Sequence, residues 1–344
     1  MGESSLNYVK FSDLDITIGR ANIGSLKAHA YARHNVLYDT GNVDKRSGNP
    51  VLASMNILDW WNVYSNNGPK TYSRIDFDPS MSDASIVNTF RGFSCDPDPN
   101  VPVEEHSAWL ELVNDVICGG DEEAIAYLHS FIAHLFQKPW DLPLVSIVLQ
   151  GPRGVGKGTL VDIIKRLLGR YAVMVSDWSK VTGNFNAHMA NRLLVHINDA
   201  TWGGRHDVGT LNTMITSPTV LMEGKGFNAF QVKNCVRVII DGNDDWLVFK
   251  ADDDRRFFVI KVDEGNRKPT SFYRDVFDKY SRDKSMLAGL MNYYMTYDIA
   301  SWEDKKVEII QNRKVGRGMV SVSCTHLRAH ETDSYLVCRL LLEK

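Results

Sequence analysis

The sequence has no apolar run approaching the roughly 18 residues needed to span a bilayer. Its first residues, MGESSLNYVKF, lack the basic and apolar segments of a secretory signal. Net charge is also small, because 39 lysines and arginines oppose 42 aspartates and glutamates, for a formal charge of −3. We therefore expect no membrane partner, and any binding to nucleic acid must come from local basic positions.

Cysteine is scarce as well. The five cysteines are Cys95, Cys118, Cys235, Cys324 and Cys338. They form no CxxC pair, and no Cys/His spacing suits zinc, so reduced thiols in a cytosolic protein are predicted. His129 and His134 have no cysteine or carboxylate partner at ligand spacing. We predict them to be surface or core histidines.

The last residues, 321–344, resemble the conceptual translation of a sequencing-library adapter. VSCTHLRAHET and LVCRLLLEK match its two halves in order, with a short variable segment between them. We interpret this tail as non-native, and a genuine C-terminal helix is the alternative.

Four further regions are distinguished by their patterns. Residues 1–100 mix short apolar runs with turn-forming residues, which predicts an irregular or β-rich lead-in region. Residues 101–140 place apolar side chains at helical spacing and predict a helical, collar-like region. Residues 141–265 alternate apolar runs, loops and a helix, and are predicted to be the catalytic core. Residues 266–320 again favour helices.

The fold class follows from near-continuous apolar runs in the core. These runs are 145–149, 192–197, 236–240 and 257–262. Strands of this kind are typical of a parallel sheet covered on both faces, so an α/β fold is predicted.

A glycine-rich loop follows the first of these strands. Gly151, Gly156 and Lys157 match the pattern G-x-x-x-x-G-K, and Gly154 adds flexibility between them. Glycines let backbone N–H groups converge on phosphate oxygens, and the lysine supplies a charge to the β- and γ-phosphates. The helix that starts near Gly158 adds its positive N-terminal end. The stretch predicts a nucleotide-binding site.

The residue after the lysine departs from the usual pattern. A serine or threonine hydroxyl normally binds Mg²⁺ there, whereas this chain has Gly158, followed by Thr159. Thr159 can hydrogen-bond a phosphate, but the position that usually ligates Mg²⁺ has no hydroxyl.

Polar side chains end the next two strands. Asp199 can orient Mg²⁺ or polarise the attacking water, and Asn198 takes the place of the first of two adjacent acids. Asn243 can hold that water against the γ-phosphate. The alternatives are that Asp199 only caps a turn and that Asn243 only forms one beside Gly242.

Two basic features follow. Arg255 and Arg256 precede the fourth strand; they are either a solvated face or arginine fingers that act at a neighbouring site. Residues 220–230 read as two short strands around a tip that carries Lys225 and Phe227, with Lys233 after them. A lysine and a ring at a loop tip suit a single nucleic-acid strand, and an ordinary hairpin is the alternative.

In this order the motifs resemble those of the superfamily 3 helicases, and more narrowly the helicase domain of virus- and plasmid-encoded primase-helicases. The resemblance covers about residues 72–262 and implies an AAA+ fold with ATP and Mg²⁺ as cofactors. It implies a homohexameric ring on single-stranded DNA, working with a primase or other replication proteins in the host cytoplasm. The implied roles are phosphate grip for Lys157, water activation for Asp199, sensor for Asn243 and trans-acting finger for Arg255 or Arg256. Lys225 would grip DNA.

Two other functions remain open. A nucleotide kinase of the adenylate type shares the GKGT form of the loop, but it would need an acceptor site and an arginine-rich lid. A DNA-binding ATPase that does not unwind would fit the incomplete Mg²⁺ set at Gly158 and Asn198.

Overall fold

The computed structural model describes the backbone of residues 5–11, 16–22, 35–43 and 50–56. It also describes residues 74–83, 86–176, 181, 189–198, 205–222, 230–243 and 255–316. The chain forms two compact units, Met1–Arg91 and Gly92–Lys344. No helix in these ranges is both long and apolar enough to cross a membrane. The adapter-like tail lies outside them.

The first unit contains two-stranded sheets. β1 (Ser5–Phe11) pairs antiparallel with β2 (Ile16–Asn22), and β3 (Asn35–Val43) pairs antiparallel with β4 (Pro50–Asn56). The short strands β5 (Arg74–Asp76) and β6 (Ile86–Asn88) run parallel. Phe77 and Phe90, which follow them, meet edge to face with ring centroids 5.9 Å apart.

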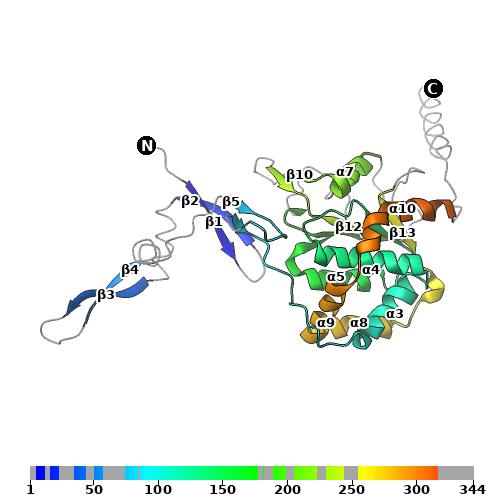
Figure 1. Ribbon diagram of the computed structural model, residues 1–344, viewed down its shortest axis with the longest axis horizontal. Coiled ribbons are helices and arrows are strands. Elements are labelled where there is room, and N and C mark those ends of the chain that lie inside the picture. The colour runs from blue at the N-terminus through cyan, green and yellow to red at the C-terminus, as the bar shows by residue number, and fades with distance from the viewer. Residues whose placement is uncertain are drawn as a thin grey trace, which may run out of the picture. The chain divides into compact units, whose positions relative to one another are not determined.

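A five-stranded parallel sheet is the centre of the second unit (Figure 1). Its strands are β7 (Ser146–Gln150), β8 (Ala172–Val175), β9 (Leu194–Asn198), β12 (Arg237–Gly242) and β13 (Phe257–Lys261). Their order across the sheet is β13-β7-β12-β9-β8. The predicted α/β class with a parallel sheet is therefore confirmed. β8 was not predicted, because it is a four-residue edge strand in which Met174 is 52% exposed.

Helices surround this sheet and form an adjoining helical region. They are α3 (Ser107–Glu111), α4 (Glu122–Gln137), α5 (Lys157–Leu168), α7 (Arg205–Thr216), α8 (Thr270–Arg282), α9 (Lys284–Thr296) and α10 (Ala300–Gly316). A π-helical turn, Leu112–Ile117, continues α3, and short 3-10 turns span Val103–His106, Gly169–Tyr171 and Glu264–Asn266. α7 and a hairpin of β10 (Thr219–Met222) and β11 (Phe230–Lys233) complete the unit.

Each face of the sheet has its own apolar cover. Leu211, Met214 and Ile215 of α7 share a buried cluster with alternate residues of the strands, among them Val195 and Ile240. The other face meets α5, which contacts β8 and β9. The near-continuous apolar character of the strands follows from this double cover.

A polar chain fixes the helical region. Trp109 Nε1 donates to the Tyr294 hydroxyl at 2.9 Å, and that hydroxyl lies 3.1 Å from His129 Nδ1. His129 Nε2 lies 2.9 Å from Asn114 Oδ1. Because an amide oxygen only accepts, Nε2 carries the proton and Nδ1 accepts from Tyr294. Asp121 caps the start of α4, because its carboxylate accepts from Ala124 N at 3.2 Å.

Candidate functional site

The glycine loop joins β7 to α5, as the sequence predicts. Gly154 and Gly156 have φ angles of +79° and +91°, which favour glycine strongly. Gly156 directly precedes α5, whose first residue is Lys157. The backbone N–H groups of the loop and of the first helical turn therefore gather at one place, next to the positive end of the helix dipole.

Packing fixes the position of this loop. A Cβ atom on Gly151 would lie 2.4 Å from the carbonyl oxygen of Val262, which follows β13. A Cβ atom on Gly156 would lie 2.6 Å from Tyr273 Cε1 and 2.9 Å from Leu112 Cδ1. Any larger residue at either glycine would thus overlap with atoms from distant parts of the chain.

Lys157 lies inside the loop rather than in solvent. Only 6% of the residue is exposed. Its ammonium group donates to the carbonyl oxygens of Gly151 and, at 2.7 Å, of Pro152. A cation is therefore present where the loop N–H groups gather, which is an arrangement suited to an anionic ligand.

The two positions after the lysine differ, because only the second carries a hydroxyl group. Gly158 and Thr159 occupy the first turn of α5. A Cβ atom on Gly158 would meet nothing within 4 Å. The packing of the described residues therefore leaves room for a Cβ atom at this position.

Asn243 is brought to the loop from the end of β12. In the amide orientation that satisfies both neighbours, its Nδ2 donates to the Gly151 carbonyl at 3.0 Å and its Oδ1 accepts from Arg153 Nε at 2.8 Å. The structure thus joins two predicted site residues, Gly151 and Asn243. It adds Arg153, which occupies a variable position of the loop pattern and therefore could not be selected from the pattern.

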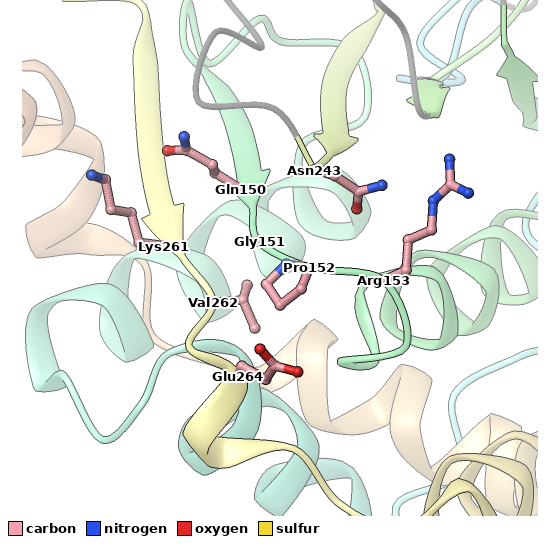
Figure 2. Close-up of a pocket in the computed structure, with 8 residues that line it drawn as sticks. All are labelled: Gln150, Gly151, Pro152, Arg153, Asn243, Lys261, Val262 and Glu264. Atoms are coloured by element: carbon pink, nitrogen blue, oxygen red, sulfur yellow. The ribbon is translucent and has the colours of Figure 1, made fainter.

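A pocket of about 580 Å³ opens beside the loop (Figure 2). This volume is in the range of small-molecule sites. Its lining residues are Gln150, Gly151, Pro152, Arg153, Asn243, Lys261, Val262 and Glu264. They come from the C-terminal ends of β7, β12 and β13, where parallel α/β sheets bind ligands. Arg153 and Lys261 outnumber Glu264, so the formal charge of the lining is positive.

A further cation lies over the loop. The guanidinium Nη2 of Arg267 is 2.9 Å from the place that a Cβ atom on Gly154 would take. Arg267 directly follows the short turn Glu264–Asn266. The sequence pattern gave no signal for it, because its approach to the loop depends on how the chain returns after β13.

The second predicted strand end is only partly described. Asn198 is the last residue of β9, and its amide Nδ2 lies 3.8 Å from the sulfur of Met174 on β8. Asp199 lies outside the described residues. β9 neighbours β12 in the sheet, so both predicted strand ends lie at the same edge as the glycine loop.

Arg255 and Arg256 lie at the opposite edge. Phe257 pairs with Ser146 at the start of β7, and the Arg256 carbonyl accepts from Ser146 N at 2.7 Å. The five residues of β13 separate these arginines from the loop, a span of about 16 Å. That distance exceeds the reach of an arginine side chain, so the structure does not bring either residue to the loop of its own chain.

The predicted hairpin is present as β10 and β11. The two strands pair antiparallel, with Thr219 opposite Lys233. Lys233 is exposed at the end of β11. The tip residues Lys225 and Phe227 lie outside the described residues.

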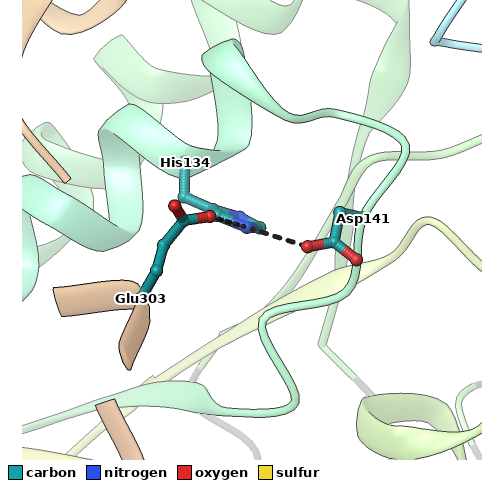
Figure 3. A group of neighbouring side chains, drawn as sticks. All are labelled: His134, Asp141 and Glu303. Carbon is teal, nitrogen blue, oxygen red and sulfur yellow. Dashed lines mark ion pairs between the residues drawn. The ribbon is translucent and has the colours of Figure 1, made fainter. Parts of the chain in front are cut away.

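A second group of ionisable side chains has the spacing of a metal site but not its chemistry. His134 Nε2 lies 3.5 Å from Asp141 Oδ2 and 3.8 Å from Glu303 Oε1 (Figure 3). Arg237 Nη2 lies 3.2 Å from His134 Nδ1 and can only donate, so the ring proton is on Nε2, facing the carboxylates. A cation between them would meet this N–H group, so we assign no metal there.

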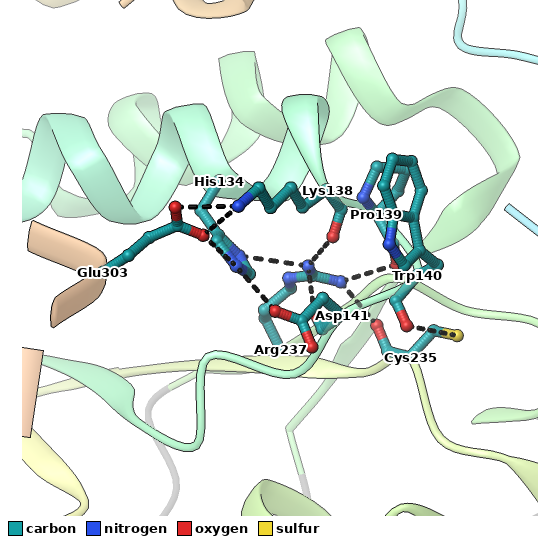
Figure 4. A network of polar contacts seen from close by, with 8 residues as sticks. All are labelled: His134, Lys138, Pro139, Trp140, Asp141, Cys235, Arg237 and Glu303. Atoms are coloured by element: carbon teal, nitrogen blue, oxygen red, sulfur yellow. Dashed lines mark hydrogen bonds and ion pairs between the residues drawn. The ribbon is translucent and has the colours of Figure 1, made fainter. Parts of the chain in front are cut away.

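The same group is instead a structural hub (Figure 4). The Arg237 guanidinium is buried and donates to the carbonyls of Pro139, Cys235 and Lys138 at 2.9, 2.9 and 2.6 Å. Burial lowers the pKa of Arg237 to about 10, which leaves it charged at neutral pH. It thereby caps the C-terminal end of α4 and connects it to β12. Both histidines of α4, His129 and His134, are buried.

The comparisons with known proteins begin with a family. The family described as a family of unknown function (DUF5906) matches residues 149–256, a stretch that runs from the end of β7 to Arg256. The match therefore includes the glycine loop, both predicted strand ends and the hairpin.

Individual relatives come from a phage. The DNA primase-polymerase of Nitratiruptor phage NrS-1 is 24% identical over 236 residues, which are 65% of this chain and 32% of that protein. This chain thus spans about a third of that relative's length. The apo structure of the NrS-1 C-terminal region matches with a TM-score of 0.60 and 19% identity, over 87% of this chain and 68% of that chain. A second apo structure, the A form of that region, has the same TM-score and covers 90% and 70%. The fold is therefore shared with the NrS-1 C-terminal region.

Proposed function

We propose that the chain is an ATP-driven DNA helicase of the superfamily 3 type that acts in the replication of a virus or another mobile element. The observation that carries this proposal is the meeting of Lys157 and Asn243 at the Gly151 carbonyl. A cation from a helix N-terminus and an amide from a neighbouring strand end converge on one glycine loop, which supports phosphoryl transfer at this place.

The chain's own residues divide the work at this site. Loop N–H groups and Lys157 bind the β- and γ-phosphates, and Asn243 orients the attacking water. The predicted Asp199 accepts the proton of that water. Arg153 donates to the Asn243 amide oxygen and thereby helps to orient this side chain.

Magnesium would be held by oxygen donors at the end of β9. Asn198 ends that strand, and Asp199 is the carboxylate next to it; amide and carboxylate oxygens suit Mg²⁺. Gly158 supplies no ligand, so the donor set from the loop itself is limited to Thr159. When bound, Mg²⁺ supplies charge neutralisation at the phosphates.

The distant arginines support action between subunits. Since Arg255 and Arg256 cannot reach their own loop, a role in hydrolysis requires that they enter the site of a neighbouring copy. A homohexameric ring satisfies this requirement at every site. In such a ring, hydrolysis would move the hairpins that carry Lys225, Phe227 and Lys233 along a single DNA strand.

The relatives supply the biological setting of the proposal. The matched curated protein is named a DNA primase-polymerase and comes from a phage. We accordingly place this chain in the cytoplasm of a host cell, together with a primase or other replication proteins.

A DNA-binding ATPase that does not unwind is the second candidate, and Gly158 favours it. Without a hydroxyl at this position Mg²⁺ is bound more weakly, and in this candidate hydrolysis is too slow to drive strand separation.

The decisive experiment measures ATP hydrolysis with and without single-stranded DNA, followed by displacement of a labelled strand. Wild-type protein should hydrolyse ATP, be stimulated by DNA and displace the strand; Lys157→Ala should do none of these. Hydrolysis without displacement would favour the second candidate. ADP production that requires AMP would identify a nucleotide kinase. Turnover indifferent to both DNA and Lys157→Ala would refute the helicase.

A further inference from the structure

A buried ionisable pair links the two strands that lead to the predicted catalytic residues. His196 of β9 is 1% exposed and Asp241 of β12 is 5% exposed. His196 Nε2 lies 2.9 Å from Asp241 Oδ1. His196 Nδ1 is buried and has no hydrogen-bond partner among the described residues. Within the part of the chain that the structure describes, the ring is therefore held through Nε2.

This pair is unexpected on grounds of stability. Adjacent positions of the two strands include the buried apolar residues Val195, Ile197 and Ile240. Two apolar side chains would fill the same place without the loss of hydration that an ionisable pair suffers on burial. Buried polar pairs of this kind add geometric specificity in some proteins, because only one alignment satisfies them.

The register shows which alignment the pair selects. His196 lies opposite Ile239, and Asp241 lies opposite Asn198, so the bond runs diagonally between the strands. A slip of one strand against the other would break it. The next residue, Gly242, accepts at its carbonyl from Gly151 N at 3.2 Å. Hydrogen bonds therefore run from β9 through β12 to the first glycine of the loop.

The pair also lies immediately before the groups that the proposed chemistry needs. Asn198 follows His196 by two residues, and Asn243 follows Asp241 by two. Because side chains alternate along a strand, Asn198 lies on the same face of the sheet as His196, and Asn243 directly follows the last residue of β12. The hydrogen bond thus connects β9 and β12 two residues before Asn198 and Asn243.

We propose that His196 and Asp241 are positioning residues that hold the end of β9, and with it Asn198, in register with Asn243 and the glycine loop. This inference rests on the proposed function, since it concerns the geometry of ATP hydrolysis. Neither residue is assigned a contact with the nucleotide.

The test replaces both members by apolar residues. The double variant His196→Leu/Asp241→Val removes the diagonal bond without leaving a buried charge unpaired. We expect its thermal unfolding midpoint and its Kd for ATP to match those of wild type, while kcat falls about tenfold or more, because small displacements of catalytic groups are costly. A residue with a merely structural role would alter stability and leave kcat unchanged.

Two controls sharpen the result. His196→Gln keeps an N–H donor near the position of Nε2, and kcat should return to within about threefold of wild type. Ile239 lies opposite His196. Ile239→Val makes a small apolar change at this place, and kcat should not change.

Three outcomes are separable. A folded double variant with wild-type kcat overturns the positioning role. If the double variant fails to fold, His196→Gln compared with His196→Asn decides, since the shorter amide cannot reach Asp241; equal kcat values for the two overturn the role. A wild-type protein that binds but never hydrolyses ATP overturns the proposed function and the inference together.

Discussion

Two glycines separated by one residue should respond to alanine in opposite directions. Gly156 has a φ angle of +91°, and its Cβ would lie 2.6 Å from Tyr273 and 2.9 Å from Leu112. Gly158 has an open side-chain position in the first turn of α5. The same substitution therefore meets strain and overlap at the first site and neither at the second.

The magnitudes follow from these geometries. The left-handed conformation costs a non-glycine residue about 1–2 kcal/mol, and overpacking adds about 1–3 kcal/mol. Gly156→Ala should thus lower the free energy of unfolding by about 2–5 kcal/mol. Gly158→Ala should raise it by about 1 kcal/mol, because alanine is the better helix former.

Urea unfolding followed by circular dichroism measures both changes at the same protein concentration. Gly158→Ser serves as the matched third variant, since it adds the hydroxyl that usually binds Mg²⁺ at this position. It should keep the stability near wild type and raise ATP hydrolysis at low Mg²⁺. Equal destabilisation by Gly156→Ala and Gly158→Ala would refute the reasoning from loop geometry.

Three further results are expected. Burial lowers the pKa of His129 to about 4, below its unfolded value of about 6.5, so the unfolded state binds more protons as the pH falls; the contribution of His129 to stability should drop by about 1.5 kcal/mol between pH 6.5 and 5, and urea titrations should show a total loss smaller by this amount in His129→Gln. Arg313→Met, which removes ion pairs of 2.8 and 3.0 Å to Asp121 and Glu123, should cost about 1–3 kcal/mol, with a smaller loss in high salt as the check. Arg255→Ala and Lys157→Ala proteins, each inactive alone, should recover ATP hydrolysis when mixed, whereas a finger that acts within one chain would give no recovery.

Local patterns predicted much of the second unit. The apolar runs placed β7, β9, β12 and β13 because strands covered on both faces must be apolar throughout. The glycine spacing likewise placed the loop, since its left-handed positions are visible in the residue types.

What could not be predicted depends on contacts between distant segments. Arg153, Lys261 and Glu264 line the pocket only because β7, β12 and β13 end together. The pairing of His196 with Asp241 requires the register of two strands 45 residues apart. Neither feature has a signature in sequence spacing. β8 was missed for a different reason, because a short half-exposed edge strand has little periodicity to detect.

β13 has a consequence for how successive sites in a ring would communicate. The strand begins next to Arg255 and Arg256 and leads to Val262, whose carbonyl oxygen lies against Gly151. It is hydrogen-bonded along its length to β7, which leads into the same loop. If a neighbour's phosphates displaced the arginines, β13 and β7 would transmit the displacement to this subunit's own nucleotide loop, because paired strands deform little. β13 would then transmit displacement from one nucleotide site to the next. The order of ATP hydrolysis around a ring would depend on this connection within each subunit.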